Sequence, residues 1–208
     1  MHAAILELEI VGLKRDIVQP EGMNPLIIYT VEGTGEGPHK NVMMYGHLDK
    51  QPHFEGWHEG LSATTPVIRG DYMYGRGCSD DGYAAFGCML AVKICQVQGV
   101  KLPRICMTLE TEEESGSPSL VTLLEQAEGI IGTPDIMLCM DSGALDYRQM
   151  WMTSSLRGIC VLEVEVSFAG VGYHSGECGG ILPETMRIMR DLLDRIDNSK
   201  TGKVIDAL

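Results

Sequence analysis

Four short apolar runs, none of which alternates with polar residues, constrain the fold of this 208-residue chain most strongly. They lie at residues 25–31, 41–46, 104–109 and 135–140. A strand that is apolar on both faces is typical of a parallel sheet covered by helices on both sides. Because segments with helical features also lie along the chain, the sequence predicts an α/β fold with a largely parallel sheet.

Two segments in this part of the chain have the features of helices. Residues 82–98 carry apolar residues at helical spacing, and the nearly all-apolar first half predicts deep burial. Ser117 followed by Pro118 is typical of a helix start, because serine can cap the first turn and proline needs no hydrogen bond there. We expect this second helix to end near residue 128. A hairpin is expected near residues 67–71.

The pattern changes after residue 152. Within residues 158–168, apolar and polar residues alternate from Cys160 onward, which predicts a strand with one solvated face. A glycine-rich loop follows, and then a predicted helix at residues 183–196. We therefore expect an α/β domain at residues 1–152 and the beginning of a smaller α+β domain at residues 153–208.

The composition excludes several classes of partner. The net charge is −13, and phosphate binding needs a basic face, so a nucleic-acid partner is not expected. The seven cysteines include no CxxC pair and lie mostly in apolar runs, which is typical of reduced thiols in a cytoplasmic protein. The chain shows neither a secretory signal nor an apolar run of about 18 residues, so no membrane partner is expected. The acidity fits either ordinary solubility or a cluster of carboxylates that holds cations.

Acidic residues and one histidine follow the predicted strands or lie in a glycine-flanked segment. The carboxyl ends of parallel strands line one crevice, so we expect these side chains to meet there. Crowded carboxylates repel one another, and a shared divalent cation removes that repulsion; a histidine and carboxylate set suits Zn²⁺ or Mn²⁺. The set comprises His47, Asp49, Asp80, Asp81, Glu112, Glu113, Glu114 and Asp141.

Each member of this set also has a structural explanation. His47 and Asp49 form a common short pattern, although residues two apart in an extended segment point the same way, so Asp49 could orient His47. Asp80 and Asp81 could belong to a turn, the three glutamates to a solvated surface, and Asp141 to a cap. Their joint occurrence in this order favours a metal site.

Five ordered motifs resemble those of the M20 metallopeptidases, and they are most similar to the cytosolic non-specific dipeptidases and carnosinases. The resemblance covers roughly residues 25–200. The segment SLRGICVLEVEV at 155–166 is similar to the strand that opens the family's lid, or dimerisation, domain. The motifs are GHLD at 46–49, GRGCSDDG at 75–82, EEESGS at 112–117, MDSG at 140–143 and GYHSGECGG at 172–180.

The resemblance implies a metallopeptidase catalytic domain that binds two divalent metal ions, Zn²⁺ or Mn²⁺. By this similarity, His47 and Asp141 would bind one ion, Glu114 would bind the other, and Asp80 would bridge them. The family's activity is the hydrolysis of small amide bonds in small peptides or N-acyl amino acids. A homodimer formed through the lid is a further expectation of the resemblance.

The same resemblance implies the remaining roles. Asp49 would orient His47, Glu113 would act as the general base, and His174 would contact the substrate. We align Glu113 and Glu114 with the family's glutamate pair, which leaves Glu112 without a role.

The chain departs from the family in its length, because family members are usually much longer. The family's sixth metal ligand is a histidine, and no histidine follows His174 here, so the second metal site is expected to lack one ligand. Three alternatives to an active enzyme therefore stay open. The chain could be an inactive truncated fragment, or an interaction module that retains a partial metal site. It could also be an acidic α/β interaction domain without metal.

Overall fold

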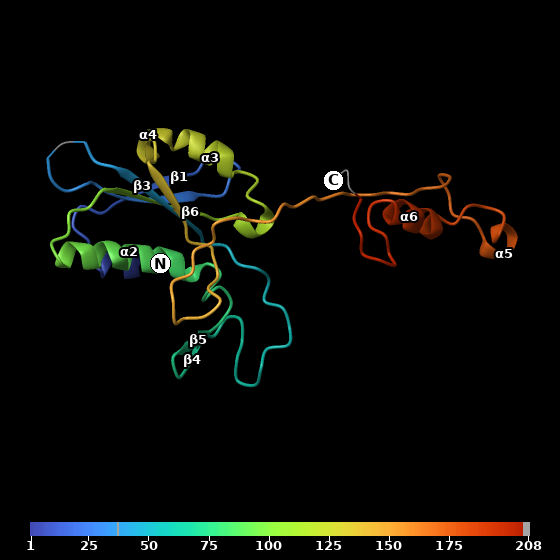
Figure 1. Ribbon diagram of the computed structural model, residues 1–208, viewed down its shortest axis with the longest axis horizontal. Coiled ribbons are helices and arrows are strands. Elements are labelled where there is room, and N and C mark those ends of the chain that lie inside the picture. Colours follow the sequence, from blue (N-terminus) through green and yellow to red (C-terminus); the bar gives the residue numbers. More distant parts are fainter. Residues whose placement is uncertain (37, 206–208) are drawn as a thin grey trace. The chain divides into compact units, whose positions relative to one another are not determined.

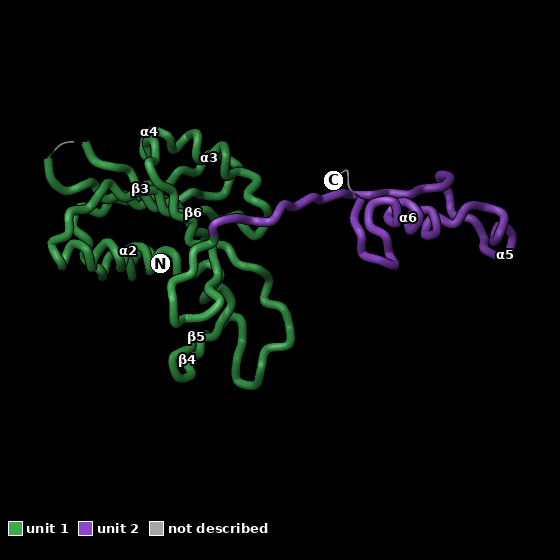
Figure 2. Tube along the Cα trace, in the orientation of Figure 1, with its two compact units in different colours: residues 1–153 green, residues 154–208 purple. Residues whose placement is uncertain are grey.

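The computed structural model describes residues 1–36 and 38–205. The chain divides into two compact units, Met1–Thr153 and Ser154–Leu208 (Figure 2). This division lies next to the boundary that the sequence predicts after residue 152. The interpretation of the second unit as the beginning of a lid stays a prediction.

A mixed five-stranded sheet forms the centre of the first unit, in the order β1-β2-β6-β3-β7 (Figure 1). β3 pairs in parallel with both β6 and β7, whereas β2 pairs antiparallel with β1 and β6. All four predicted strands form, and the central strands are mostly parallel, as expected. The strands are β1 (Lys14–Val18), β2 (Leu26–Val31), β3 (Asn41–His47), β6 (Arg104–Glu110) and β7 (Ile136–Cys139).

Helices cover both faces of this sheet (Figure 1). On one face, Ala84, Ala85, Cys88, Met89 and Val92 of α2 (Gly82–Val97) pack against the sheet. On the other face lie α3 (Leu120–Gln126) and α4 (Glu128–Ile131), which contribute to a second apolar cluster. A short helix, α1 (His2–Leu6), precedes β1, and its Ile5 belongs to the α2 cluster.

Strand β6 shows why the strands are apolar throughout. Its residues Ile105, Met107 and Leu109 belong to the cluster beneath α2, whereas Cys106 belongs to the cluster beneath α3 and α4. Successive side chains of a strand point to opposite faces, so a strand covered on both sides needs apolar residues at every position.

The connection from β3 to α2 contains the predicted hairpin. Its strands are β4 (Val67–Arg69) and β5 (Tyr72–Tyr74), which pair antiparallel. Among the described residues, no helix is long and apolar enough to cross a membrane. All seven cysteines are free.

The predicted start of the helix at Ser117 is wrong. α3 begins at Leu120, after a 3₁₀ turn at Glu113–Ser115, and Ser117 itself has a positive φ of 52°. Its hydroxyl donates a hydrogen bond to the buried carboxylate of Glu110 at 2.9 Å. The serine therefore holds the turn against β6 and does not cap the helix.

The second unit also corrects the sequence analysis. The predicted strand at 158–168 does not form: these residues carry neither helix nor strand, and Ile159, Val161 and Leu162 are exposed. A strand needs a partner for its backbone N–H and C=O groups, and none of the described residues provides one. The helix predicted at 183–196 is present as α6 (Thr185–Asp194), and a short helix, α5 (Ser175–Cys178), precedes it.

Candidate metal centre

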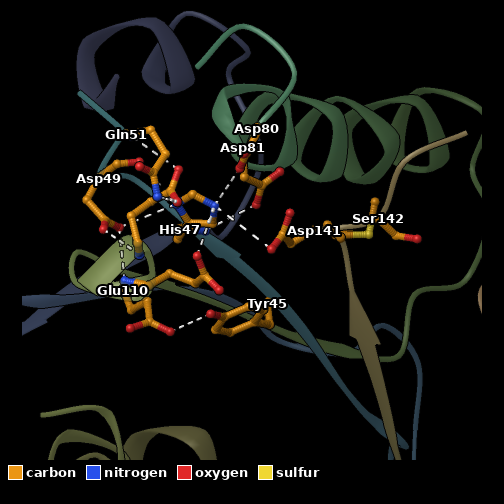
Figure 3. A network of polar contacts seen from close by, with 12 residues as sticks. Tyr45, His47, Asp49, Gln51, Asp80, Asp81, Glu110, Asp141 and Ser142 are labelled. Atoms are coloured by element: carbon orange, nitrogen blue, oxygen red, sulfur yellow. Dashed lines mark hydrogen bonds and ion pairs between the residues drawn. The ribbon is translucent and has the colours of Figure 1, made fainter. Parts of the chain in front are cut away.

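Several of the predicted site residues, among them His47, Asp80 and Asp141, converge at the carboxyl ends of the parallel strands of the first unit (Figure 3). β3 ends at His47, which lies opposite Glu110 at the end of β6. Asp141 follows the end of β7, and Asp80 lies just before the start of α2. Residues far apart in the sequence are thus brought to one edge of the sheet, as the rule for parallel strands predicts.

Three of these side chains form a group that could hold a metal ion. Within the described part of the chain, the ligand atoms of His47, Asp80 and Asp141 all lie within 4.8 Å of one another. The Nε2 atom of His47 is 3.0 Å from Asp80 Oδ1 and 4.0 Å from Asp141 Oδ2. The imidazole is fully buried, whereas the Asp80 side chain is 60% exposed. The group therefore has a buried wall and an open side from which a cation could enter.

Asp49 lies beside the other nitrogen of the imidazole. The Nδ1 atom of His47 is 3.1 Å from the Asp49 carbonyl oxygen and 3.4 Å from its carboxylate. If a cation binds, an Nδ1–H group that donates to Asp49 would leave the Nε2 lone pair available to the metal. The carboxylate also accepts the backbone N–H groups of Glu113 and Glu114, at 3.2 and 2.9 Å. Asp49 thus fixes both the histidine and the glutamate turn.

The three consecutive glutamates point in different directions. Glu113 faces the group, with Oε2 at 3.9 Å from His47 Nε2. Glu114 accepts hydrogen bonds from the backbone and the side chain of Gln51. Glu112 accepts from Asn24 at 2.8 Å and from the Ser119 backbone at 3.2 Å. The structure therefore brings Glu113 to the cluster and leaves Glu114 and Glu112 outside it.

Asp81 supports the site through the backbone of His47. It is buried, and its Oδ2 accepts the backbone N–H of His47 at 3.1 Å. Its Oδ1 has no hydrogen-bond partner among the residues described here. Gly46 permits this approach, because a Cβ at that position would lie 2.6 Å from Asp81 Oδ2 and 2.7 Å from the Cβ of Ala84.

The electrostatics of the group favour the arrival of a cation. Burial raises the pKa of Asp81 to about 6, and the charge of Asp141 adds to the rise. Burial also raises the pKa of Glu113, again with a contribution from Asp141. Burial lowers the pKa of His47, but the hydrogen bond to Asp80 and the charge of Asp141 leave it raised overall. Protons thus relieve the crowding of carboxylates here, and a divalent ion would do the same.

His174 lies in the second unit, directly before α5. Its side chain accepts the backbone N–H of Gly176 at 3.1 Å and caps α5. Its role in substrate binding stays a prediction.

Sequence reasoning missed several supporting residues. The Tyr83 hydroxyl donates to the carbonyl of Met140, directly before Asp141. Buried Glu110 accepts from the hydroxyl of Tyr45, and burial together with Glu110 raises the pKa of that tyrosine. Tyr45 was recognisable as a polar residue two positions before His47 on an apolar strand. The link from Gln51 to Glu114 had no comparable signal.

These features define an α/β protein with a candidate divalent-metal site at the carboxyl edge of its parallel strands. The family model of peptidase family M20/M25/M40 matches residues 43–175, which contain every residue of this site. The chain belongs to this family, and the resemblance noted in the sequence is confirmed.

Several relatives carry dipeptidase names. The Cys-Gly metallodipeptidase dug1 of Schizosaccharomyces pombe is 32% identical over 83% of this chain and 38% of that protein. The human Beta-Ala-His dipeptidase is 31% identical over 86% of this chain and 36% of that protein. The structure of the Saccharomyces cerevisiae di-peptidase Dug1p has a TM-score of 0.65 at 24% identity, and the match covers 99% of this chain and 45% of that one. The chain thus spans less than half the length of the relatives it matches.

Proposed function

We propose that this chain carries part of the active site of a metal-dependent dipeptidase that hydrolyses small amide bonds. The observation that carries the proposal is the group formed by His47, Asp80 and Asp141, with Glu113 beside it. The chain's membership of the M20 family and the metallodipeptidase names of its relatives support it. Small dipeptides are the first substrate class that we propose, followed by N-acyl amino acids.

The donor set of this group fits a divalent cation. One imidazole and two carboxylates suit Zn²⁺ or Mn²⁺, and a bound ion supplies Lewis acidity and lowers the pKa of a coordinated water to near 7. We propose that His47, Asp80 and Asp141 hold one ion and that Asp80 is shared with a second. Glu114 would join the second site by exchanging its hydrogen bonds to Gln51 for the cation.

Glu113 is the general base of the proposed reaction. Its carboxylate takes a proton from the attacking water and later passes it to the leaving amine. Burial raises the pKa of this carboxyl, which brings it closer to the pH at which proton transfer in both directions is efficient. Asp49 positions the Glu113 backbone and the His47 ring. His174 would contact the substrate, and a homodimer stays a proposal as well.

A pair of neighbouring glutamates provides the test. Glu113→Gln should lower the hydrolysis of Cys-Gly or β-Ala-His at least about a hundredfold and leave the metal content unchanged. Glu112→Gln is the matched control, because that carboxylate binds Asn24 and Ser119 outside the cluster. We would measure turnover with added Zn²⁺ or Mn²⁺ and metal content by elemental analysis. Equal turnover in both variants would refute the role of Glu113. Bound metal without turnover in the unmodified chain would support the non-catalytic alternative.

A further inference from the structure

Lys50 follows the GHLD motif directly and buries its charged end. Its Nζ atom is inaccessible to solvent and has no hydrogen-bond partner within the described residues. The aliphatic part of the side chain passes over Gly77, where a Cβ would overlap the Cδ and Cε atoms of the lysine. An ammonium group without a hydrogen bond is costly to bury, so its position requires a favourable field from nearby charges.

Buried Asp81 contributes to that field. The positive charge of Lys50 acts on Asp81, where it opposes the rise in pKa that burial causes. The same charge acts on His47, where it lowers the pKa in the same direction as burial. The contact with Gly77 places the lysine against the glycine-rich segment that carries Asp80 and Asp81. The ammonium thus lies beside the segment that carries Asp80 and Asp81, without a hydrogen bond to any carboxylate of the described residues.

We propose that Lys50 is an internal counter-charge of the metal centre. Its ammonium neutralises part of the repulsion among the carboxylates and so reduces the affinity of the cluster for divalent cations. This inference rests on the proposed metal site. A fixed positive charge near a site repels an incoming divalent ion, and a repulsion of about 1.4 kcal/mol corresponds to a tenfold loss of affinity.

The test compares neutral replacements of two lysines. We would titrate the purified chain, after chelator treatment, with Zn²⁺ and with Mn²⁺ by isothermal titration calorimetry. Lys50→Met and Lys50→Gln should both bind the ion about tenfold more tightly than the unmodified chain. Lys101→Met is the matched control, because it removes the same charge from an exposed position. Lys101 lies shortly before the start of β6, whereas Glu110 and the candidate site lie at the other end of that strand. The affinity of this variant should stay within about twofold.

The outcomes separate this inference from the proposed function. Unchanged or weaker binding in both Lys50 variants, with native circular dichroism, would overturn the counter-charge and leave the metal site intact. An equal gain in Lys101→Met would overturn it too, because the effect would then follow net charge alone. The absence of metal binding in every variant would refute the metal centre itself.

Discussion

Replacing Gly46 by alanine should destabilise the first unit, because the added methyl group has no space. The new Cβ would lie 2.6 Å from Asp81 Oδ2 and 2.7 Å from the Cβ of Ala84. Both neighbours are buried, so neither can move into solvent. Overpacking of this kind costs about 1–3 kcal/mol. For a chain of this size, each kcal/mol corresponds to roughly 2–4 °C, so we expect the melting temperature to fall by about 2–12 °C.

The same substitution should also weaken metal binding. Asp81 Oδ2 must move away from the new methyl group, and it then loses the hydrogen bond from the backbone N–H of His47. If His47 shifts, its Nε2 atom moves relative to the carboxylates of Asp80 and Asp141. We would measure thermal unfolding by circular dichroism, with and without Zn²⁺, and expect the stabilisation by Zn²⁺ to shrink in the variant.

Gly87→Ala is the matched control for this prediction. Gly87 lies in α2 with only Tyr83 Cδ2 near a new Cβ, at 3.8 Å. Alanine is the better helix former there, so this variant should gain about 0.5–1 kcal/mol. The two glycine substitutions should thus shift the melting temperature in opposite directions. A Gly46→Ala variant that melts at or above the unmodified chain would refute the packing argument.

Three further predictions concern the support of the site. Tyr83→Phe removes the hydroxyl that donates to the Met140 carbonyl, so the free energy of unfolding measured in urea should fall by about 1 kcal/mol. Zn²⁺ should also bind more weakly, and an unchanged affinity would mean that Asp141 needs no such support. Asp49→Asn should weaken metal binding about 10–100-fold in a calorimetric titration, and binding within twofold of the unmodified chain would contradict its orienting role. The pKa of Asp81 is raised to about 6, so its folded form holds the proton more tightly than its unfolded form. Its contribution to stability is therefore full at low pH and is lost as the pH rises through about 6. In chelator, the melting temperature should fall less between pH 4.5 and 7 in Asp81→Asn than in the unmodified chain, and an equal fall would exclude Asp81 as the cause.

The sequence predicted the central strands well because a strand buried on both faces is apolar at every position. β1 was not predicted, because this edge strand contains Lys14, Arg15 and Asp16, and its outer side pairs with no other strand of the sheet. The prediction of a strand at residues 158–168 was wrong for a different reason. Its alternation is typical of a strand, but a pattern of side chains does not supply the backbone partner that a strand requires.

The candidate site was predictable to the level of the motif and no further. The rule for parallel strands predicted that His47, Asp80 and Asp141 lie together, and their ligand atoms lie within 4.8 Å of one another. The directions of Glu113 and Glu114 depend on a turn in which Asp49 accepts both backbone N–H groups, and consecutive identical residues carry no sign of it. The burial of the Lys50 ammonium could not be predicted from the sequence either, since a lysine after a loop motif is usually solvated.

Residues of different sequence segments hold one another in place at the candidate site. Gly46 of GHLD makes room for Asp81 of GRGCSDDG, and Asp81 in turn holds the His47 backbone. Asp49 of GHLD fixes the turn of EEESGS, and Tyr83, at the start of α2, holds the carbonyl before Asp141 of MDSG. The small and supporting residues are thus as constrained as the candidate ligands. A change in one motif is therefore expected to displace the ligand that another one carries, which explains why the motifs are informative together and weak alone.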